Sequence, residues 1–273
     1  MSEYDVRYIR ELRSSEELAD CFLRQRYETD DGIHAIATLH YRGGRTEFDL
    51  GRRHVESADA GERAVGADIL SQLGWQKKTF LDESVDLLIP LLKDSEAVVI
   101  RSAAIALGHR KDPRAIPPLL PLINHPDPEV RYGAVAGLSG HDHPDAVAGL
   151  IQLSRDSDDT TRDWATFGLG SQTELDTPAL RDALVARLAD LDPEIRGEAM
   201  IGLARRGDER ARPAIEAEFR GPFHGDWSLE AAELLACREW IPLLEAQAKT
   251  LAPEEGAAFA RAFESALAAC RQR

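Results

Sequence analysis

The sequence predicts an all-α superhelix, an α-solenoid in which short helix pairs stack side by side. An Ala-x-x-small-Leu motif recurs, and its final leucines lie 34, 31, 31, 34 and 32 residues apart. No alternating β-branched runs that would indicate strands lie between these motifs. A short helix pair cannot bury its apolar stripe alone, so neighbouring units must stack into a continuous core. The leucines are Leu73, Leu107, Leu138, Leu169, Leu203 and Leu235.

Each unit is expected to hold two helices. Asp127 precedes Pro128, and Asp192 precedes Pro193, as is typical of an N-cap followed by proline at the first helical position. Apolar and small residues then recur at three- and four-residue spacing, which favours a helix with one buried stripe. Short second helices are predicted over residues 113–123, 144–153, 178–188 and 238–248.

The repeat sets the expected domain organisation. Residues 1–58 do not follow it closely and are predicted to form an N-terminal helical cap. Residues 59–250 are predicted to form about six helix pairs, and residues 251–273 a single C-terminal capping helix. Caps with polar outer faces are what a soluble solenoid requires.

Composition excludes several functional classes. The chain has 273 residues, 33 basic and 48 acidic, and a net charge of -15, which repels nucleic-acid phosphates. Its longest apolar runs are six to eight residues, against about 20 for a membrane-spanning helix. The charged N-terminal segment lacks the apolar core of a signal peptide, so we expect a cytoplasmic protein. Three separated cysteines suggest neither a disulfide framework nor a zinc site.

The repeat pattern D-x-D-P-x-(V/I)-R-x-x-A-x-x-(G/A)-L resembles HEAT repeats, specifically the PBS lyase HEAT-like repeats, over about residues 59–250. The strings YRGGRTEF, ADILSQLG, RDWATFGLG and IRGEAMIGLARRGDER are similar to the bacterial YibA-type HEAT-repeat proteins. The resemblance implies a superhelical fold and a general interaction role. It brings no catalytic residue and no cofactor to this chain.

The resemblance also implies a ladder, in which an Asp six residues before an Arg links neighbouring units. Two pairs have this spacing, Asp156–Arg162 and Asp190–Arg196. Before Arg131 the Asp is replaced by His125, Ile100 stands where an Arg would follow Asp94, and the units ending at Leu73 and Leu235 lack both members. The ladder is therefore expected only through the middle of the stack.

Enzyme and metal sites find little support in the sequence. A lyase related to the phycobilin lyases stays an alternative, but no nucleophile and base stand at a defined spacing, and fold alone does not transfer a reaction. None of the eight histidines precedes a Glu, as a di-iron hydroxylase of this fold would need. A histidine-rich group is interpreted as residues that form turns and helix starts rather than as a metal site, because its members fall in turns at opposite edges of the stack. The group comprises His125, His141 and His143 with Asp127, Asp142 and Asp145.

Charge and one aromatic residue point to a protein partner. Residues 121–200 hold 6 basic and 15 acidic side chains, and Asp127, Asp158 and Asp192 recur at one place in successive units. Such a stripe, with Asp159 beside Asp158, can steer a basic partner. Trp164 stands where the other units have small or polar residues, namely Asp68, Ser102, Gly133, Glu198 and Glu230.

Two interpretations of Trp164 stay open. It can be an exposed interface anchor next to Asp163, the role in which tryptophan is most enriched, or it can cover the junction with the neighbouring unit. We prefer the second, because the resemblance includes this string.

The sequence thus predicts a non-enzymatic scaffold or adaptor for protein–protein interaction, a monomer or weak dimer, with a basic or mixed-charge partner. A chaperone-like or immunity-like protein that blocks its partner is a further alternative. The expected partner-binding residues are Trp164, Asp163, Asp127, Asp158, Asp159 and Asp192.

Overall fold

The computed structural model describes residues 8, 11–222, 225–250 and 253–272, and it describes side chains for all of these except 253–258. Parts of all three predicted regions lie outside the described residues: positions 1–7 and 9–10 of the N-terminal cap, 223–224 of the repeats, and 251–252 and 273 of the C-terminal capping helix. The described chain is helical throughout and contains no strand, which confirms the predicted all-α superhelix. It divides into two compact units, residues 1–138 and 139–273.

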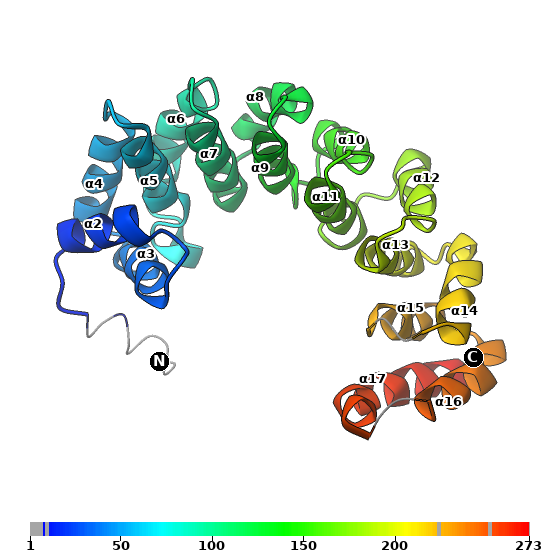
Figure 1. The fold of residues 1–273 in the computed structure, drawn as a ribbon. Helices are drawn as coiled ribbons and strands as arrows, with labels where there is room; N and C mark the ends of the chain where they lie inside the picture. Colours follow the sequence, from blue (N-terminus) through cyan, green and yellow to red (C-terminus); the bar gives the residue numbers. More distant parts are fainter. Residues whose placement is uncertain (1–7, 9–10, 223–224, 251–252, 273) are drawn as a thin grey trace. The chain divides into compact units, whose positions relative to one another are not determined.

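In the first unit, α5, α7 and α9 pack side by side (Figure 1). Helix α4 packs against α5, α6 against α7 and α5, and α8 against α9. Helices α2 and α3 form a pair beside α5. The α-helices are α2 (Ser15–Gln25), α3 (Asp30–Arg42), α4 (Arg45–Val55), α5 (Ala60–Ser71), α6 (Leu81–Leu91), α7 (Ala97–Arg110), α8 (Ile116–Leu119) and α9 (Pro128–Leu138). Short 3-10 helices are η1 (Trp75–Lys77), η2 (Pro113–Ala115) and η3 (Leu120–Asn124).

The second unit has the same two-layer construction. Helices α11, α13, α15 and α17 pack in sequence, and α10, α12, α14 and α16 form the other layer (Figure 1). The α-helices are α10 (Pro144–Leu153), α11 (Asp159–Ser171), α12 (Pro178–Arg187), α13 (Pro193–Arg205), α14 (Arg212–Arg220), α15 (Trp227–Leu235), α16 (Ile241–Ala248) and α17 (Pro253–Gln272). Short 3-10 helices η4 (Glu209–Ala211) and η5 (Arg238–Trp240) precede α14 and α16.

The predicted second helix over residues 113–123 is broken into η2, α8 and η3. Pro117, Pro118 and Pro121 lie inside this segment and remove backbone N–H donors, which prevents a continuous α-helix. Helices α6 and α14 were not among the predicted second helices. The first begins after Phe80, a residue in the left-handed conformation with φ 52°, rather than after a proline turn.

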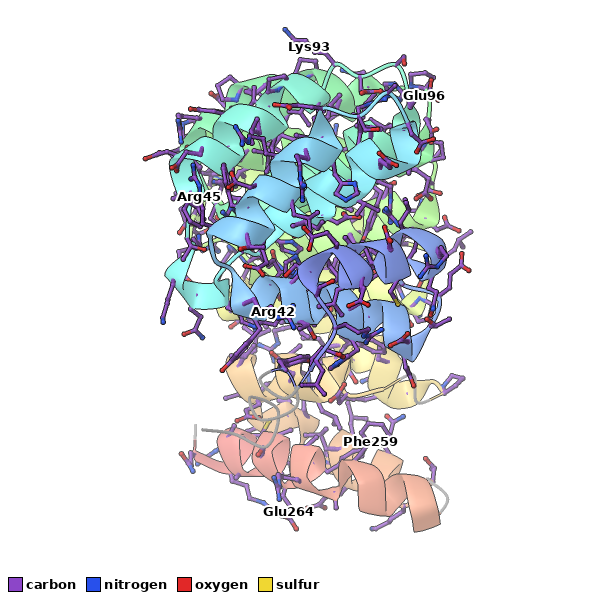
Figure 2. The ribbon with its side chains drawn as sticks, turned by 90° about the vertical axis from the view of Figure 1, so that its left-hand side faces the viewer. Arg42, Arg45, Lys93, Glu96, Phe259 and Glu264 are labelled. Atoms are coloured by element: carbon purple, nitrogen blue, oxygen red, sulfur yellow. The ribbon has the colours of Figure 1, made fainter. Side chains whose placement is uncertain are left out.

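All six repeat leucines are buried. Five lie on the buried stripe of a first helix, and Leu73 follows the end of α5. At the beginning of the chain, Arg42 ties the segment before α2 to α3. Its guanidinium donates to the backbone carbonyls of Glu11 and Arg13 at 3.1 and 2.8 Å and to the hydroxyl of Ser15 at 3.2 Å. Arg42 is labelled in Figure 2.

One turn recurs before the first helices. The side chain two residues before the N-cap accepts the N-cap amide, as Asp156 does from Asp158 at 2.9 Å and Asp190 from Asp192 at 3.2 Å. His125 performs this role with Nδ1, which accepts the amide of Asp127 at 3.2 Å. His125 therefore replaces the expected Asp in the turn, although as a neutral acceptor it does not carry the negative charge of a carboxylate.

The ladder is built by arginines placed four residues after the N-cap. The Nη1 group of Arg162 donates to the carbonyl of its own unit's Asp156 at 3.0 Å, while Nε and Nη2 reach the carboxylate of Asp190 in the next unit at 2.9 and 3.2 Å. Arg196 bonds the carbonyl of Asp190 in the same way but pairs with Glu218, at 3.2 and 3.1 Å, rather than with an Asp. The first-unit Arg131 donates to the carbonyls of His125 and Pro126.

The expectation that the repeat ending at Leu73 lacks a ladder arginine was wrong. Arg63 lies four residues after the N-cap Asp59 and binds Asp94 through Nε and Nη2 at 2.8 and 2.9 Å. The leucine alignment missed this arginine because Leu73 lies beyond the end of α5 at Ser71, three residues out of register. In the register of the N-caps, the counterpart of Trp164 is Val65 rather than Asp68.

Candidate protein-binding surface

The acidic residues predicted to form a stripe are N-caps. Asp158 accepts hydrogen bonds at 2.8 Å from both the amide and the hydroxyl of Thr161. Asp192 accepts the amide of Glu194 at 2.8 Å, and in the first unit Asp127 accepts the amide of Glu129 at 2.8 Å. Asp158 and Asp192 therefore occur together at the N-terminal edge of α11 and α13. These carboxylates are partly used in capping the helices that follow them.

Asp159 is exposed at this edge, with 76% of its side chain accessible, and it forms an ion pair with Arg162 at 2.7 Å. Its position at the start of α11 leaves most of the carboxylate in water. The edge of α11 and α13 therefore presents two exposed acids, Asp159 and Glu194, beside the two capping ones.

Trp164 is 44% exposed, so part of its surface is open to a partner and the rest is covered by the protein, and both interpretations of this residue stay open. Its ring contacts Phe167, one helical turn further on, edge to face with centroids 5.8 Å apart. Phe167 is half-buried, as is Asp163. The helix α11 thus presents an aromatic pair and a carboxylate on the face that points away from its buried stripe.

Neighbouring helices extend this face. Trp227 of α15 lies over Gly197 of α13, where an added Cβ would come within 2.4 Å of the indole Cγ. The indole N–H of Trp227 bonds Glu198. Glu230 of α15 pairs with Arg205 of α13 at 3.1 Å. We define the acidic-aromatic face as Asp163, Trp164, Phe167, Glu194, Glu198, Trp227 and Glu230.

The surroundings of two carboxylates on this face, Asp163 and Glu198, disfavour their charged form. Burial, with repulsion from Glu194 and Asp192, raises the pKa of Asp163 to about 6, and Arg162 opposes the shift. Burial also raises the pKa of Glu198, which is opposed by the Trp227 hydrogen bond and reinforced by Asp163 and Glu230. The atoms Asp163 Oδ1 and Glu198 Oε2 are buried, and neither has a hydrogen-bond partner within the described part of the chain.

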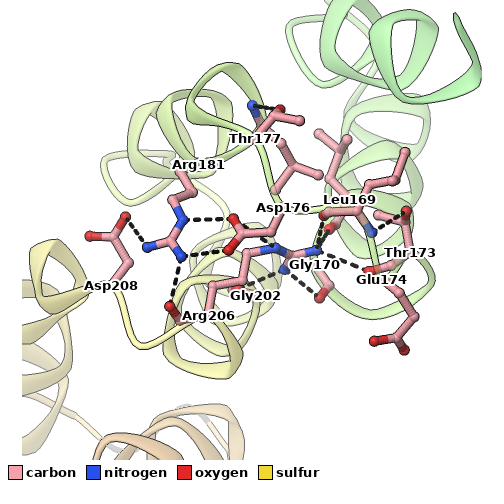
Figure 3. A network of polar contacts seen from close by, with 12 residues as sticks. Leu169, Gly170, Thr173, Glu174, Asp176, Thr177, Arg181, Gly202, Arg206 and Asp208 are labelled. Carbon is pink, nitrogen blue, oxygen red and sulfur yellow. Dashed lines mark hydrogen bonds and ion pairs between the residues drawn. The ribbon is translucent and has the colours of Figure 1, made fainter. Parts of the chain in front are cut away.

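A second arginine network holds α11 against α13 (Figure 3). Nearly all of the Arg206 side chain is buried, and it donates to backbone carbonyls at the end of α11 and in the following turn. The distances are 3.0 Å to Leu169, 3.1 Å to Gly170, 3.0 Å to Thr173 and 3.2 Å to Leu175. Burial lowers the pKa of Arg206. The carbonyls at the helix end have no partner within the helix, and by accepting hydrogen bonds from the guanidinium they offset the cost of burying its charge.

A similar hydrogen-bond network around a buried arginine occurs in the first unit. There Arg110 donates to the carbonyls of Leu73 and Thr79 at 3.3 and 2.6 Å and to Ser84 Oγ at 2.8 Å. Both arginines stand three residues after a repeat leucine, Leu107 and Leu203. That shared spacing was the available sequence signal, and the sequence-based interpretation did not use it.

The members of the histidine-rich group have separate structural roles, and Asp142 accepts hydrogen bonds at 2.8 Å from the hydroxyl of Thr173 and the amide of Glu174. His143 is the N-cap of α10, where Nδ1 accepts the amide of Asp145 at 3.2 Å, and His141 is buried. In the parts of the chain that the structure describes, His, Cys, Asp and Glu side chains form no group of three or more suited to a metal ion. Likewise, none of the described helices is long and apolar enough to cross a bilayer.

Stacked helix pairs joined by a recurring arginine rung define the class of this protein as an α-solenoid. A family model described as HEAT repeats matches residues 85–170 and 148–236. The chain belongs to the HEAT-repeat family.

Solved structures share the fold. The X-ray structure of YibA from E. coli matches with a TM-score of 0.74 and 24% identity, over 100% of this chain and 98% of that one. Kap121p bound to Nup53p matches with a TM-score of 0.60 and 14% identity, over 89% of this chain and 29% of that one. An engineered protein matches with a TM-score of 0.55 and 16% identity, over 94% and 78%. At these identities the likeness shows the fold alone. The comparison with curated proteins gave no match.

Proposed function

We propose that this protein is a non-enzymatic scaffold or adaptor that binds a protein partner with a basic or mixed-charge surface. The observation that carries the proposal is the acidic edge of α11 and α13, where Asp158, Asp159 and Asp192 occur together. They belong to the segment 121–200, which has an excess of nine acidic side chains, 15 against 6. Charges of one sign on a repetitive surface attract a partner of opposite charge and raise its association rate.

The test begins with capture of partners by the full chain from the source cell, followed by binding measurements on each purified candidate. For a true partner, association should slow as salt rises, because the Debye length is about 8 Å near physiological ionic strength. Asp159→Lys should slow association more than it speeds dissociation, because exposed charges mainly steer the encounter. Asp145→Lys in α10, in the other layer, is the matched control.

Two outcomes would replace the proposal. If no captured protein binds in a salt-sensitive way, or if Asp145→Lys acts as strongly as Asp159→Lys, then the acidic edge is only a solvated surface. If this protein itself converts a small molecule into a product, the lyase alternative replaces the scaffold. A partner whose own activity is stopped on binding would identify a blocking protein rather than an adaptor.

A further inference from the structure

A cavity in the first unit lies where the turn between α3 and α4 meets the segment that contains η1, between α5 and α6. Its volume is about 680 Å³, which is within the range of small-molecule sites, about 300–1,000 Å³. None of the described residues that line it is acidic. The side chains that line it are two rings, two cations and two neutral polar groups, namely Tyr41, Trp75, Arg42, Lys77, Gln76 and Thr79.

The wall of the cavity has an unusual and constrained backbone. Gly43 and Gly74 have positive φ angles of 50° and 71°. Trp75 and Lys78 have φ 48° and 46°, a region that residues other than glycine rarely occupy and that is found at ligand-binding sites. The two glycines pack backbone to backbone, because a Cβ on Gly43 would lie 2.2 Å from Gly74 N. Thr79 Oγ1 donates to the carbonyl of Gly43 at 2.7 Å. These contacts hold the wall in place before a ligand arrives, which lowers the cost of binding.

Trp75 presents an open aromatic surface at this cavity. It exposes 43% of its surface. Its ring is held by an edge-to-face contact with the buried His40, with centroids 6.1 Å apart. His40 is fixed in turn, since its Nε2 donates to the carbonyl of Asp68 at 2.7 Å. The indole is therefore supported by the protein and still has free surface on which a planar ring can stack.

The surroundings of the cavity are basic, although the whole chain is acidic. The lining comes from residues 32–46 and 69–81, and neither stretch contains an Asp or a Glu. Burial, reinforced by repulsion from Lys78, lowers the pKa of the neighbouring Lys111. Acids elsewhere act weakly on a ligand in the cavity, because salt screens charges over about 8 Å near physiological ionic strength. The cavity therefore favours an anion. The Lys and Arg residues of the two stretches are Arg42, Arg45, Lys77 and Lys78.

Arg42 and Lys77 are the two cations that line the cavity. Arg42 donates to two backbone carbonyls and to Ser15 Oγ, which are neutral groups, so these bonds position the guanidinium without cancelling its charge. Glu47 is joined to Arg42 only through Ser15. Both of its oxygens are engaged, because Ser15 Oγ donates to Oε1 at 2.6 Å and the amide of Gly44 donates to Oε2 at 2.9 Å. Lys77 is exposed, and its flexible ammonium can reach a ligand.

We propose that this cavity binds a nucleoside phosphate. A phosphate monoester carries about two negative charges and several acceptor oxygens at neutral pH, so it can bind Arg42 and Lys77 together, whereas a carboxylate has charge for one of them. The planar base stacks on Trp75, and the amide of Gln76 can donate to and accept from its polar edge. This inference is independent of the proposed function, which concerns the acidic edge of α11 and α13.

Adenosine monophosphate is the probe, titrated into the full chain by calorimetry near neutral pH. Adenosine and inorganic phosphate, the two parts of this probe, should each bind at least about tenfold more weakly, because each keeps only the stacking or only the charge. Benzoate, an aromatic carboxylate, should also bind more weakly than the nucleotide. If benzoate binds as tightly, the cavity takes aromatic anions in general and the nucleotide assignment is wrong.

Variants of the lining test the place of binding. Trp75→Ala should weaken nucleotide binding about tenfold, the size of one stack between a base and an aromatic ring, whereas Trp75→Phe keeps a ring and should bind nearly as the parent chain does. Lys77→Gln should weaken binding about threefold. Lys93→Gln is the matched control and should leave binding unchanged. Lys93 is also exposed, follows α6 in the same unit, and is labelled well apart from Arg42 in Figure 2.

Three results would overturn the site. The nucleotide does not bind, Trp75→Ala binds it as tightly as the parent chain, or Lys77→Gln and Lys93→Gln weaken binding equally. Unfolding curves check that each variant is folded. If Trp75→Ala is unstable, Trp75→Phe and Trp75→Leu replace it, and equal affinities of these two variants would also contradict stacking on Trp75. None of these results bears on the salt-sensitive capture of a partner by the acidic edge, so the two proposals succeed or fail separately.

Discussion

Arg162 and Asp190 form a two-bond ion pair that joins α11 to the turn before α13, with Nε–Oδ2 and Nη2–Oδ1 distances of 2.9 and 3.2 Å. Only 14% and 7% of the two side chains are exposed. Since Asp190 also accepts the amide of Asp192, it fixes the N-terminal turn of the next helix. The pair therefore couples the position of one unit to the start of another.

Arg162→Ala should destabilise the protein by about 2 kcal/mol, because it leaves Asp190 buried with half of its bonds missing. Arg187, 3.4 Å from Asp190, limits the loss. The free energy of unfolding from urea titration is the measurement, and Asp159→Ala, which removes only the exposed partner of Arg162, should change it little. An equal effect of both variants would show that the Arg162–Asp190 pair adds no more stability than an ordinary surface pair.

Arg206→Lys should destabilise by about 2 kcal/mol although the charge is kept. The planar guanidinium reaches the four carbonyls of the α11 end and its turn together, whereas an ammonium group on a flexible stem cannot, and each orphaned carbonyl costs free energy. Arg205→Lys is the adjacent control, since that side chain is 43% exposed. Thermal unfolding of the two variants should separate them by several degrees, and coincident curves would contradict the role assigned to Arg206.

Asp163→Asn should stabilise the protein near neutral pH. The folded pKa of Asp163 is about 6, above its unfolded value, so the folded chain holds a proton that the unfolded chain releases between these values. The contribution that protonation of Asp163 makes to stability is therefore present at low pH and is lost as pH rises through 6. The groups that face it are Asp192 and Glu194, which raise its pKa, and Arg162, which lowers it.

The gain from Asp163→Asn should be about 1 kcal/mol at pH 7.5, after allowance for partial exposure, and should disappear near pH 4. Unfolding free energies of both chains across this range are the measurement. A gain that does not change with pH would mean that Asp163 is not destabilised by its surroundings.

Local patterns made the fold predictable. The leucine period, the proline-initiated helices and caps such as Asp192 follow from residues a few positions apart, and the structure reproduces them. Contacts between units were harder to predict, because the sequence does not show which side chains meet across a helix junction. Arg63 was missed because Leu73 lies beyond the end of α5 and shifts the leucine register by three residues. The Trp227–Glu198 contact depends on Gly197 leaving room for the indole.

Trp164→Ala should leave the melting temperature nearly unchanged, because 44% of the residue is already in water and its ring contact with Phe167 lies at the surface of α11. Trp240 provides the internal comparison. It is fully buried, and its indole N–H donates to Glu216 at 3.2 Å. Trp240→Ala should therefore cost about 3–5 kcal/mol and lower the melting temperature by many degrees. If Trp164→Ala instead lowers the melting temperature as Trp240→Ala does, Trp164 is a packing residue that covers the junction between units and is not an anchor for a partner.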